Sequence, residues 1–317
     1  MQTKTLFRFG QLAAPLSLAA TIALGFSNQA SAFTLGPAQD FNVFVLGDVL
    51  QSNTDVEGRM AVGGNAVLTG YGVGDKLTNS QGTRDDLIVG GKLTYNSGQV
   101  FNGNAVYGGT EEIDPQVGFP NGSHYQGTPI DFTVAKQQLF NLSTSLGNLT
   151  PTGTTSFQYG QIALNGAGSG LNVFNVSGTQ LSTANSLSIN ADANATVVVN
   201  ITGEEINFGN LGISLNGVNK QKVLYNFVDA TKLSSSGVTI LGSVLAANAA
   251  YEFNNGNLEG TLIAGSLTGN GEFHNHVFQG DIPPDREPSP VPEPAALVGL
   301  GLVAAAGVGT RRKHKNS

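Results

Sequence analysis

The sequence predicts a mainly β protein, specifically a right-handed β-helix (β-solenoid) with one amphipathic helix packed alongside it. Three observations support this fold class. Glycine is abundant and charged residues are few, short β-forming runs follow one another along the chain, and some of these runs recur at fixed offsets. The alternative is a β-sandwich with glycine-rich turns, which the equal offsets make the less favoured interpretation.

The composition bounds the kind of protein. The chain has 317 residues with 43 Gly, 12% charged residues, 40% hydrophobic residues and no Cys. This hydrophobic content is sufficient for a packed core and argues against general disorder. Disulfides, thiolate metal sites and cysteine nucleophiles are excluded, so stability must come from backbone hydrogen bonds and apolar packing.

The middle of the chain reads as a succession of short strands. Runs of about four to six residues, rich in Val, Ile, Leu and Phe, alternate with clusters of Asn, Gly, Ser and Asp. β-branched and aromatic residues suit the half-buried surface of a pleated sheet. The clearest runs are 41–46, 59–62, 86–89, 171–176 and 196–201.

Several of these runs are offset copies of one another. The segment 61–65 (AVGGN) recurs at 88–92 (IVGGK) and at 106–110 (VYGGT), with offsets of 27 and 18 residues, and 242–246 (GSVLA) recurs at 260–264 (GTLIA) with an offset of 18. An offset of this size fits one coil of a solenoid, in which equivalent residues stack. The glycines are expected at corners, where a positive φ or a close backbone approach is required.

One segment has helical rather than strand periodicity. Between residues 131 and 147, apolar residues recur at steps of three and four, which predicts an amphipathic helix with Asp131 as its N-cap and Gly147 just past its end. Its apolar stripe is expected to pack on the side of the solenoid. Pro115, Pro120 and Pro129 mark the preceding segment, which includes His124, as an irregular excursion.

Residues 1–32 have the pattern of a secretory signal peptide. Lys4 and Arg8 precede a charge-free apolar run, and a small-x-small motif follows it. The alternative is a membrane anchor, but a run of about 15 residues is short for a spanning helix, which needs about 20. Signal peptidase is expected to recognise Ala30 and Ala32 and to cleave before residue 33.

The C-terminal end has a second export pattern. Residues 281–291 are a proline-rich linker, and 292–317 contain a Pro-Glu-Pro motif, a charge-free apolar stretch and a basic tail. This arrangement resembles the PEP-CTERM sorting signal of Gram-negative bacteria, including cyanobacteria. The resemblance implies a transient inner-membrane anchor and processing by an exosortase at the motif Pro292, Glu293 and Pro294. The alternative is an ordinary C-terminal membrane anchor.

The exported part is acidic. Residues 33–294 contain 22 acidic and nine basic residues, a net charge of −13. Such a surface repels phosphate backbones, so no nucleic-acid partner is expected.

Residues 33–280 contain characteristic motifs at both ends, namely 41–48, 55–65, 242–249, 257–264 and 271–276. These motifs resemble the choice-of-anchor A family. That family consists of surface proteins that share one domain but carry different anchors. The resemblance implies an exported adhesive domain and names no activity. The helix beside the coils is also similar, as an architecture only, to bacterial ice-binding β-helices.

Few residues suggest site chemistry, and no catalytic residue, cofactor or metal site is predicted. Glu272, His274 and His276 alternate, so on a strand they share one face and are the candidate metal ligands; the alternative is an exposed or capping role in a terminal coil.

A second group, Asp48, Asp55 and Glu57, contains carboxylates that could bind calcium or form a glycosidase pair. The favoured interpretation is solvated turn and edge residues.

The predicted function is that of a non-enzymatic exported protein of the cell surface, outer membrane or biofilm matrix, an adhesin for exopolysaccharide or neighbouring cells. The alternatives are a carbohydrate-active β-helix enzyme and an ice-binding-like protein. Ice binding favours a regular threonine ladder, and Thr69, Thr94 and Thr268 do not form one at an offset of 18.

Overall fold

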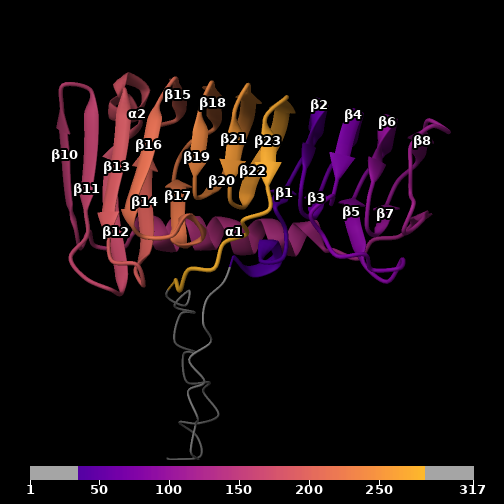
Figure 1. Cartoon of the computed structure of the whole chain (residues 1–317), viewed down its shortest axis with the longest axis horizontal. Coiled ribbons are helices and arrows are strands. Elements are labelled where there is room, and N and C mark those ends of the chain that lie inside the picture. Colours follow the sequence, from indigo (N-terminus) through magenta and orange to yellow (C-terminus); the bar gives the residue numbers. More distant parts are fainter. Residues whose placement is uncertain (1–34, 283–317) are drawn as a thin grey trace, which may run out of the picture. The chain divides into compact units, whose positions relative to one another are not determined.

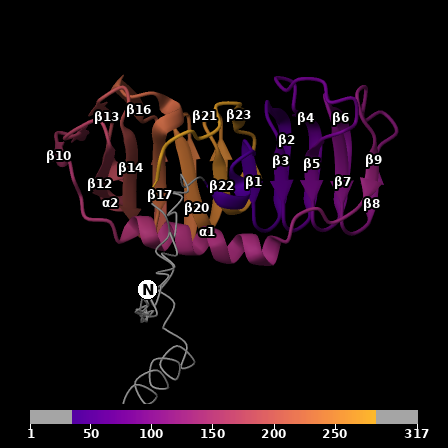
Figure 2. The same cartoon turned by 90° about the horizontal axis from the view of Figure 1, so that it is seen from below.

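Residues 35–282 are the part of the chain that the computed structural model describes, and they form a β-helix with a long helix beside it (Figures 1 and 2). Each coil contributes strands, or parts of longer bent strands, to stacked sheets. The sheet on the side of the long helix, called the helix-side sheet, contains in spatial order β12 (Leu171–Ser177), β14 (Thr196–Thr202), β17 (Val223–Phe227), β20 (Ser243–Asn254), β22 (Leu262–Gly269), β1 (Val43–Val45), β3 (Met60–Val62), β5 (Asp85–Val89), β7 (Asn104–Tyr107) and β9 (His124–Gln126).

Two further sheets complete the coils. The groove sheet contains, in order, β15 (Glu205–Gly209), β18 (Lys232–Ser236), the C-terminal parts of β20 and β22, β2 (Val49–Val56), β4 (Ala66–Val73), β6 (Leu93–Val100) and β8 (Glu111–Ile113). The third sheet is a separate four-stranded sheet of β10 (Thr154–Gln158), β11 (Gln161–Asn165), β13 (Ser186–Ala191) and β16 (Gly212–Gly217). Beside it, without strand pairing between β16 and β19, lie β19 (Thr239–Leu241), β21 (Asn257–Glu259), β23 (Glu272–His274) and the C-terminal parts of β2, β4 and β6. Among the described strands only β10 and β11 pair antiparallel, so the β-helix is confirmed and the β-sandwich alternative is wrong.

The order of the coils in space differs from their order in the chain. The first strand, β1, lies in the middle of the stack, and the coils proceed from it to β9 at one end (Figure 2). The helix α1 (Phe132–Gly147) then carries the chain back along the stack, and the coils from β12 to β22 return to the middle. There β22 pairs with β1. The short helix η1 (Gly36–Ala38) precedes β1, and the short helices α2 (Gly178–Thr183) and η2 (Lys220–Lys222) lie between strands.

The predicted coil offsets are confirmed. Met60 pairs with Leu87 and Leu87 with Ala105, which are the offsets of 27 and 18. The paired glycines are not among the glycines with positive φ, so their role is close approach. A Cβ atom on Gly90 would lie 2.6 Å from the carbonyl oxygen of Gly63 in the preceding coil. Glycine therefore permits the stacking of these corners.

The predicted helix is also confirmed. The side chain of Asp131 accepts hydrogen bonds from the N–H groups of residues 133 and 134 and caps the helix, as expected. Gly147 is the last helical residue rather than the residue after the helix. The preceding segment is more regular than predicted, because His124 begins strand β9, which pairs with β7.

Most of the helix-side strands are buried on both faces, whereas β9 at one end of the stack is exposed. One face contacts the interior of the coils, and the other packs against α1, where Leu139 and Leu146 contact a second apolar layer that includes Val198 and Leu245. Strands covered on both sides need apolar residues at consecutive positions. This explains why β14 is a nearly continuous apolar run rather than an alternating one.

Buried asparagines attach α1 to this sheet. Asn226 donates from Nδ2 to the carbonyl oxygen of Ser143 at 2.9 Å and to Oδ1 of Asn200 at 2.9 Å, and its own Oδ1 accepts from the Ser143 hydroxyl at 2.7 Å. Asn200 in turn donates to the carbonyl oxygen of Leu146 at 2.8 Å. Because Asn226 and Asn200 are nearly inaccessible to water, these bonds cannot be replaced by solvent.

We expect Asn226→Ala to lower the free energy of unfolding by about 2–3 kcal/mol, because it leaves buried polar partners unsatisfied. The matched control is Asn216→Ala. Asn216 belongs to a similar asparagine ladder, in which its Nδ2 donates to Asn190 Oδ1 at 2.7 Å, but it is exposed, so a change within about 0.5 kcal/mol is expected. Urea unfolding of both variants measures the difference, and equal losses would contradict the role of the buried ladder.

Candidate functional site

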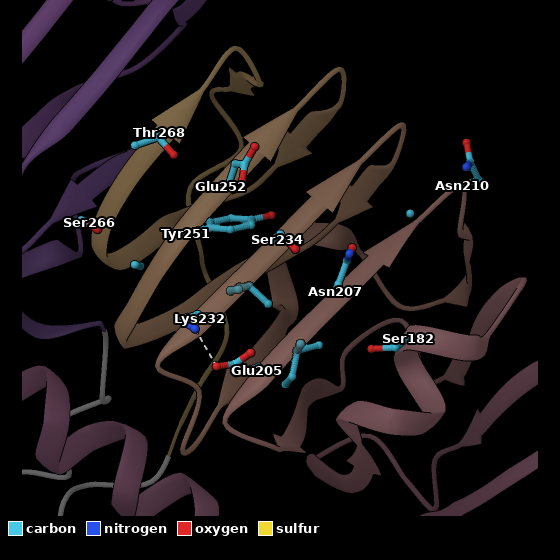
Figure 3. A pocket seen from close by; sticks show the side chains of 14 residues that line it. Ser182, Glu205, Asn207, Asn210, Lys232, Ser234, Tyr251, Glu252, Ser266 and Thr268 are labelled. Atoms are coloured by element: carbon cyan, nitrogen blue, oxygen red, sulfur yellow. Dashed lines mark hydrogen bonds and ion pairs between the residues drawn. The ribbon is translucent and has the colours of Figure 1, made fainter.

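A groove of about 940 Å³ crosses the groove sheet where β15, β18, β20 and β22 lie side by side (Figure 3). It is a surface feature rather than an enclosed cavity. Its lining is mostly hydroxyl, amide and small side chains together with two carboxylates and one ammonium group. The lining residues are Ser182, Glu205, Ile206, Asn207, Gly209, Asn210, Lys232, Leu233, Ser234, Ala250, Tyr251, Glu252, Ser266 and Thr268.

The strand register explains the hollow. Ala250 pairs with Lys232 on one side and with Ser266 on the other, so small side chains occupy the middle of this row. In the next row Ser234 lies between Asn207 and Glu252. A register shift in β20 between residues 246 and 250 bends the strand just before Ala250, as bulges do.

One wall of the groove is the short helix α2. Ser177 caps it in a capping box: the Ser177 hydroxyl accepts from the N–H of Gln180 at 3.1 Å, and the Gln180 side chain accepts from the N–H of Ser177 at 3.1 Å. Gly178 lets the helix approach β15, because a Cβ atom there would lie 2.7 Å from Ile206 Cγ1. Ser182 of this helix faces the groove (Figure 3).

The charged groups of the groove are already paired. Lys232 Nζ lies 2.6 Å from Glu205 Oε1, and this hydrogen bond and the charge of Glu205 raise the pKa of Lys232. Glu252 Oε1 accepts from Asn254 Nδ2 at 2.8 Å. With its hydroxyl, amide and carboxylate groups, the groove offers both hydrogen-bond donors and hydrogen-bond acceptors along its length. Such a lining suits a polar, hydroxyl-rich ligand.

The three candidate metal ligands of the sequence analysis do meet, but around a residue that it missed. His274 Nδ1 lies 2.5 Å from Glu259 Oε1, His276 Nε2 lies 3.3 Å from Glu259 Oε2, and His274 Nε2 lies 3.3 Å from Glu272 Oε1. Lys220 Nζ also contacts Glu259 Oε2 at 2.6 Å. Residues 35–282 contain no group of three or more His, Asp or Glu side chains placed to hold a metal ion. The cluster is an ion-pair network centred on Glu259.

A coil alignment could have found Glu259. It lies directly opposite His274 in the pairing of β21 with β23, one coil earlier in the sequence. Lys220 had no such signal, because it comes from the short helix η2 two coils away.

The carboxylates Asp48, Asp55 and Glu57 are not one cluster. Asp48 Oδ1 accepts from the N–H of Asn65 at 2.7 Å, which is a turn role. Glu57 Oε2 accepts from the N–H of Asn275 at 2.9 Å. Burial and the nearby charges of acidic residues, first Glu272, raise the pKa of Asp55 to about 6. Asp55 and Glu57 thus belong to the surroundings of the His274 network.

The threonines lie on the groove sheet without forming a ladder. Thr94 and Thr268 occupy the same row, but Leu50 and Val67 lie between them. Thr69 lies in the neighbouring row, beside Ser52.

The predicted export sites fall outside the described residues. These are the signal-cleavage residues Ala30 and Ala32 and the sorting motif Pro292, Glu293 and Pro294. Within residues 35–282, no helix combines the length and apolar character needed to cross a bilayer.

The His274 network makes stability depend on pH. Burial opposes the charge of His274, but its hydrogen bond to Glu259 and the charges of Glu259, Glu57 and Glu272 outweigh it, so the pKa of His274 is raised. When folding raises the pKa of a histidine, its protonation stabilises the folded state. This stabilisation is complete at pH values below the unfolded-state pKa of about 6.5 and is lost as the pH rises through the folded-state pKa.

We therefore expect His274→Asn to lower the free energy of unfolding by about 1 kcal/mol at pH 5, a value limited by partial exposure, and by less at pH 9. Urea unfolding at the two pH values measures this. In a Glu259→Gln background the same substitution is expected to lose most of its pH dependence, and a dependence that persists there would contradict the assignment to this pair.

Comparison with known proteins gives three results. No curated protein matches the chain. Among solved structures, the crystal structure of an ice-binding protein from the Antarctic ascomycete Antarctomyces psychrotrophicus matches with 12% identity and a TM-score of 0.34, over 80% of this chain and 100% of that one. The family described as "Putative Ice-binding-like adhesive domain" matches residues 34–275, which is most of the chain, and the chain therefore belongs to this family of ice-binding-like adhesive domains.

Proposed function

We propose that this protein is an exported adhesin of the cell surface or extracellular matrix whose groove binds exopolysaccharide without cleaving it. The observation that carries the proposal is the groove itself, with its hydroxyl, amide and carboxylate lining between β15 and β22. The description of the family as an adhesive domain also supports an adhesive role. The choice-of-anchor A resemblance is part of this proposal.

The geometry favours a repetitive ligand. Adjacent strands lie about 4.8 Å apart, so equivalent side chains form evenly spaced rows across the sheet. The row Asn207, Ser234, Glu252 and Thr268 presents four consecutive polar groups. A linear polysaccharide presents hydroxyls at regular intervals and can contact such a row at several points, each contributing modestly.

Binding without turnover suits the charges of the groove better than catalysis does. Glu205 is exposed, and its carboxylate is engaged in an ion pair with Lys232 rather than free to act as a general acid or base. The carbohydrate-active alternative requires turnover of a polysaccharide that disappears when Glu205 or Glu252 is replaced.

Ice binding is the second candidate, favoured by the family description alone. The row that contains Thr94 and Thr268 also contains Glu112 and Glu252, so it is chemically mixed. Thermal hysteresis of the purified chain, measured beside polysaccharide binding, distinguishes the two.

Filling the groove should weaken binding of the polysaccharide. Ser234→Phe places a ring in the middle of the polar row and removes a hydroxyl, and we expect affinity for the bound polysaccharide to fall by about tenfold or more. Thr94→Phe is the matched control, because it lies in the same row but outside the groove. A pull-down on a panel of immobilised extracellular polysaccharides measures binding. Equal binding of polysaccharide by the two variants would indicate that the ligand contacts another part of the protein.

We also propose that residues 292–317 form an exosortase sorting signal preceded by a linker, supported by the sequence pattern. Glu293→Ala should then leave a larger, unprocessed form in the membrane fraction, whereas Glu287→Ala in the linker should be processed normally. Immunoblots of membrane, surface and medium fractions measure this, and normal processing of the Glu293 variant would favour an ordinary membrane anchor.

A further inference from the structure

The two ends of the β-helix differ in charge. No residue between Lys136 and Asp192 is charged, and this segment builds the hairpin β10–β11 and the strands β12 and β13 at one end of the stack (Figure 1). The exported chain is otherwise acidic, with a net charge of −13 over residues 33–294. Two copies of an acidic molecule repel each other least through such an uncharged surface.

The opposite end has the features that normally protect sheet edges. β8 contains Glu111 and Glu112, and the chain beyond it contains Asp114, Pro115 and Pro120. Charges and prolines at edges prevent pairing with other chains. Strand β10, with the sequence TTSFQ, contains none of these, and no bulge interrupts its pairing with β11.

The outer edge of β10 is available for pairing. Within residues 35–282, β10 pairs with β11 alone. The loop between β10 and β11 has two residues, so the residues that flank it, Gln158 and Gln161, are expected to exchange backbone hydrogen bonds. Along β10, every second residue bonds to β11 in this way, and the residues in between direct their N–H and C=O groups away from β11. The N–H and C=O groups of Thr155 and Phe157 therefore point outward.

The tip of this hairpin has an unusual residue. Six non-glycine residues among the described ones have positive φ, and five of them are Asn, Gln or Ser. The sixth is Tyr159, with φ of 52° and 97% of its surface exposed. A bulky residue in this conformation is strained, and an exposed ring is an apolar surface without a partner in residues 35–282.

We propose that two copies of this chain associate through antiparallel pairing of their β10 strands about a two-fold axis at Ser156. The outward groups of Thr155 in one copy then pair with those of Phe157 in the other. Phe157, which is half-buried against the inner core, continues that core across the junction, and Tyr159 lies opposite Gly153 of the second copy. An interface of this symmetry closes on itself, so the product is a dimer rather than a fibre.

This inference is independent of polysaccharide binding. The groove sheet and the third sheet are different faces of the β-helix, so loss of pairing should leave groove binding intact, and the Ser234→Phe variant should still dimerise.

The test uses charge at the two-fold axis. Ser156 is exposed and would lie opposite Ser156 of the second copy, so Ser156→Lys and Ser156→Glu each place two like charges together. We expect each variant to reduce the association constant by about fivefold or more, and an equimolar mixture of the two to recover association. Sedimentation velocity of the full chain in mild detergent measures the dimer fraction over a range of concentrations.

The matched control is Ser214→Lys. Ser214 is exposed in the same row of the third sheet, on β16, away from the edge, and this variant should dimerise like the wild type. A wild-type chain that is monomeric at all concentrations, or a dimer that Ser156→Lys leaves unchanged, would overturn the proposal.

The absence of cysteine allows a second readout. In the proposed dimer, the two Ser156 residues form a non-hydrogen-bonded pair of an antiparallel sheet. The Cα atoms of such a pair lie about 4.5 Å apart, a distance that a disulfide can bridge. Ser156→Cys should therefore form a covalent dimer under mild oxidation, and Ser214→Cys should not. Equal crosslinking of both variants would indicate random collision and contradict β10 pairing.

Discussion

The pairing of β22 with β1 is the contact on which the β-helix depends. These strands lie more than two hundred residues apart in the chain, and they join the half that the chain builds first to the half that it builds last. The fully buried Asn42 holds this seam: its Nδ2 donates to the carbonyl oxygens of Gly260 at 2.6 Å and His274 at 3.0 Å, while its Oδ1 accepts from the N–H of Gly58 at 3.1 Å. Without the seam, each half would expose an unprotected edge in the middle of the stack.

The seam also decides where function can reside. Because the described chain begins and ends beside α1 near the middle of the stack, where Leu35 and Ile282 join the same apolar layer, the two ends of the stack and the groove sheet are left uncovered by these segments. The charged groups follow the same division. The network around Glu259 and His274 lies on the coils at the seam. The end of the stack that β10, β11, β12 and β13 form has no charged residue in these strands. The proposed binding through the groove and the proposed contact through one end therefore use separate surfaces.

The sequence predicts local features well and long-range order poorly. The coil offsets and α1 could be predicted because they depend on repeated glycine pairs and on helical periodicity within one segment. The position of β1 in the middle of the stack could not, since no local signal indicates that β22 will return to it. The groove escaped prediction for the same reason. Ser234 and Ala250 form a hollow only because the register places them beside Asn207 and Ser266, and each is unremarkable within its own strand.

Uneven coil length explains why the groove forms where it does. Equivalent residues of β15 and β18 are 27 positions apart, as between Glu205 and Lys232, whereas Lys232 and Ala250 are 18 apart. The longer coils have room for extra elements such as η2. Another long coil contains α2, which follows β12. This half of the stack therefore carries a wall, formed by α2, that the short coils lack. The groove lies at the transition, between the wall from α2 and the small side chains of Ala250 and Ser266. A β-helix of equal coils would present an even face there, so the irregularity that obscures the repeat in the sequence is also what shapes the groove.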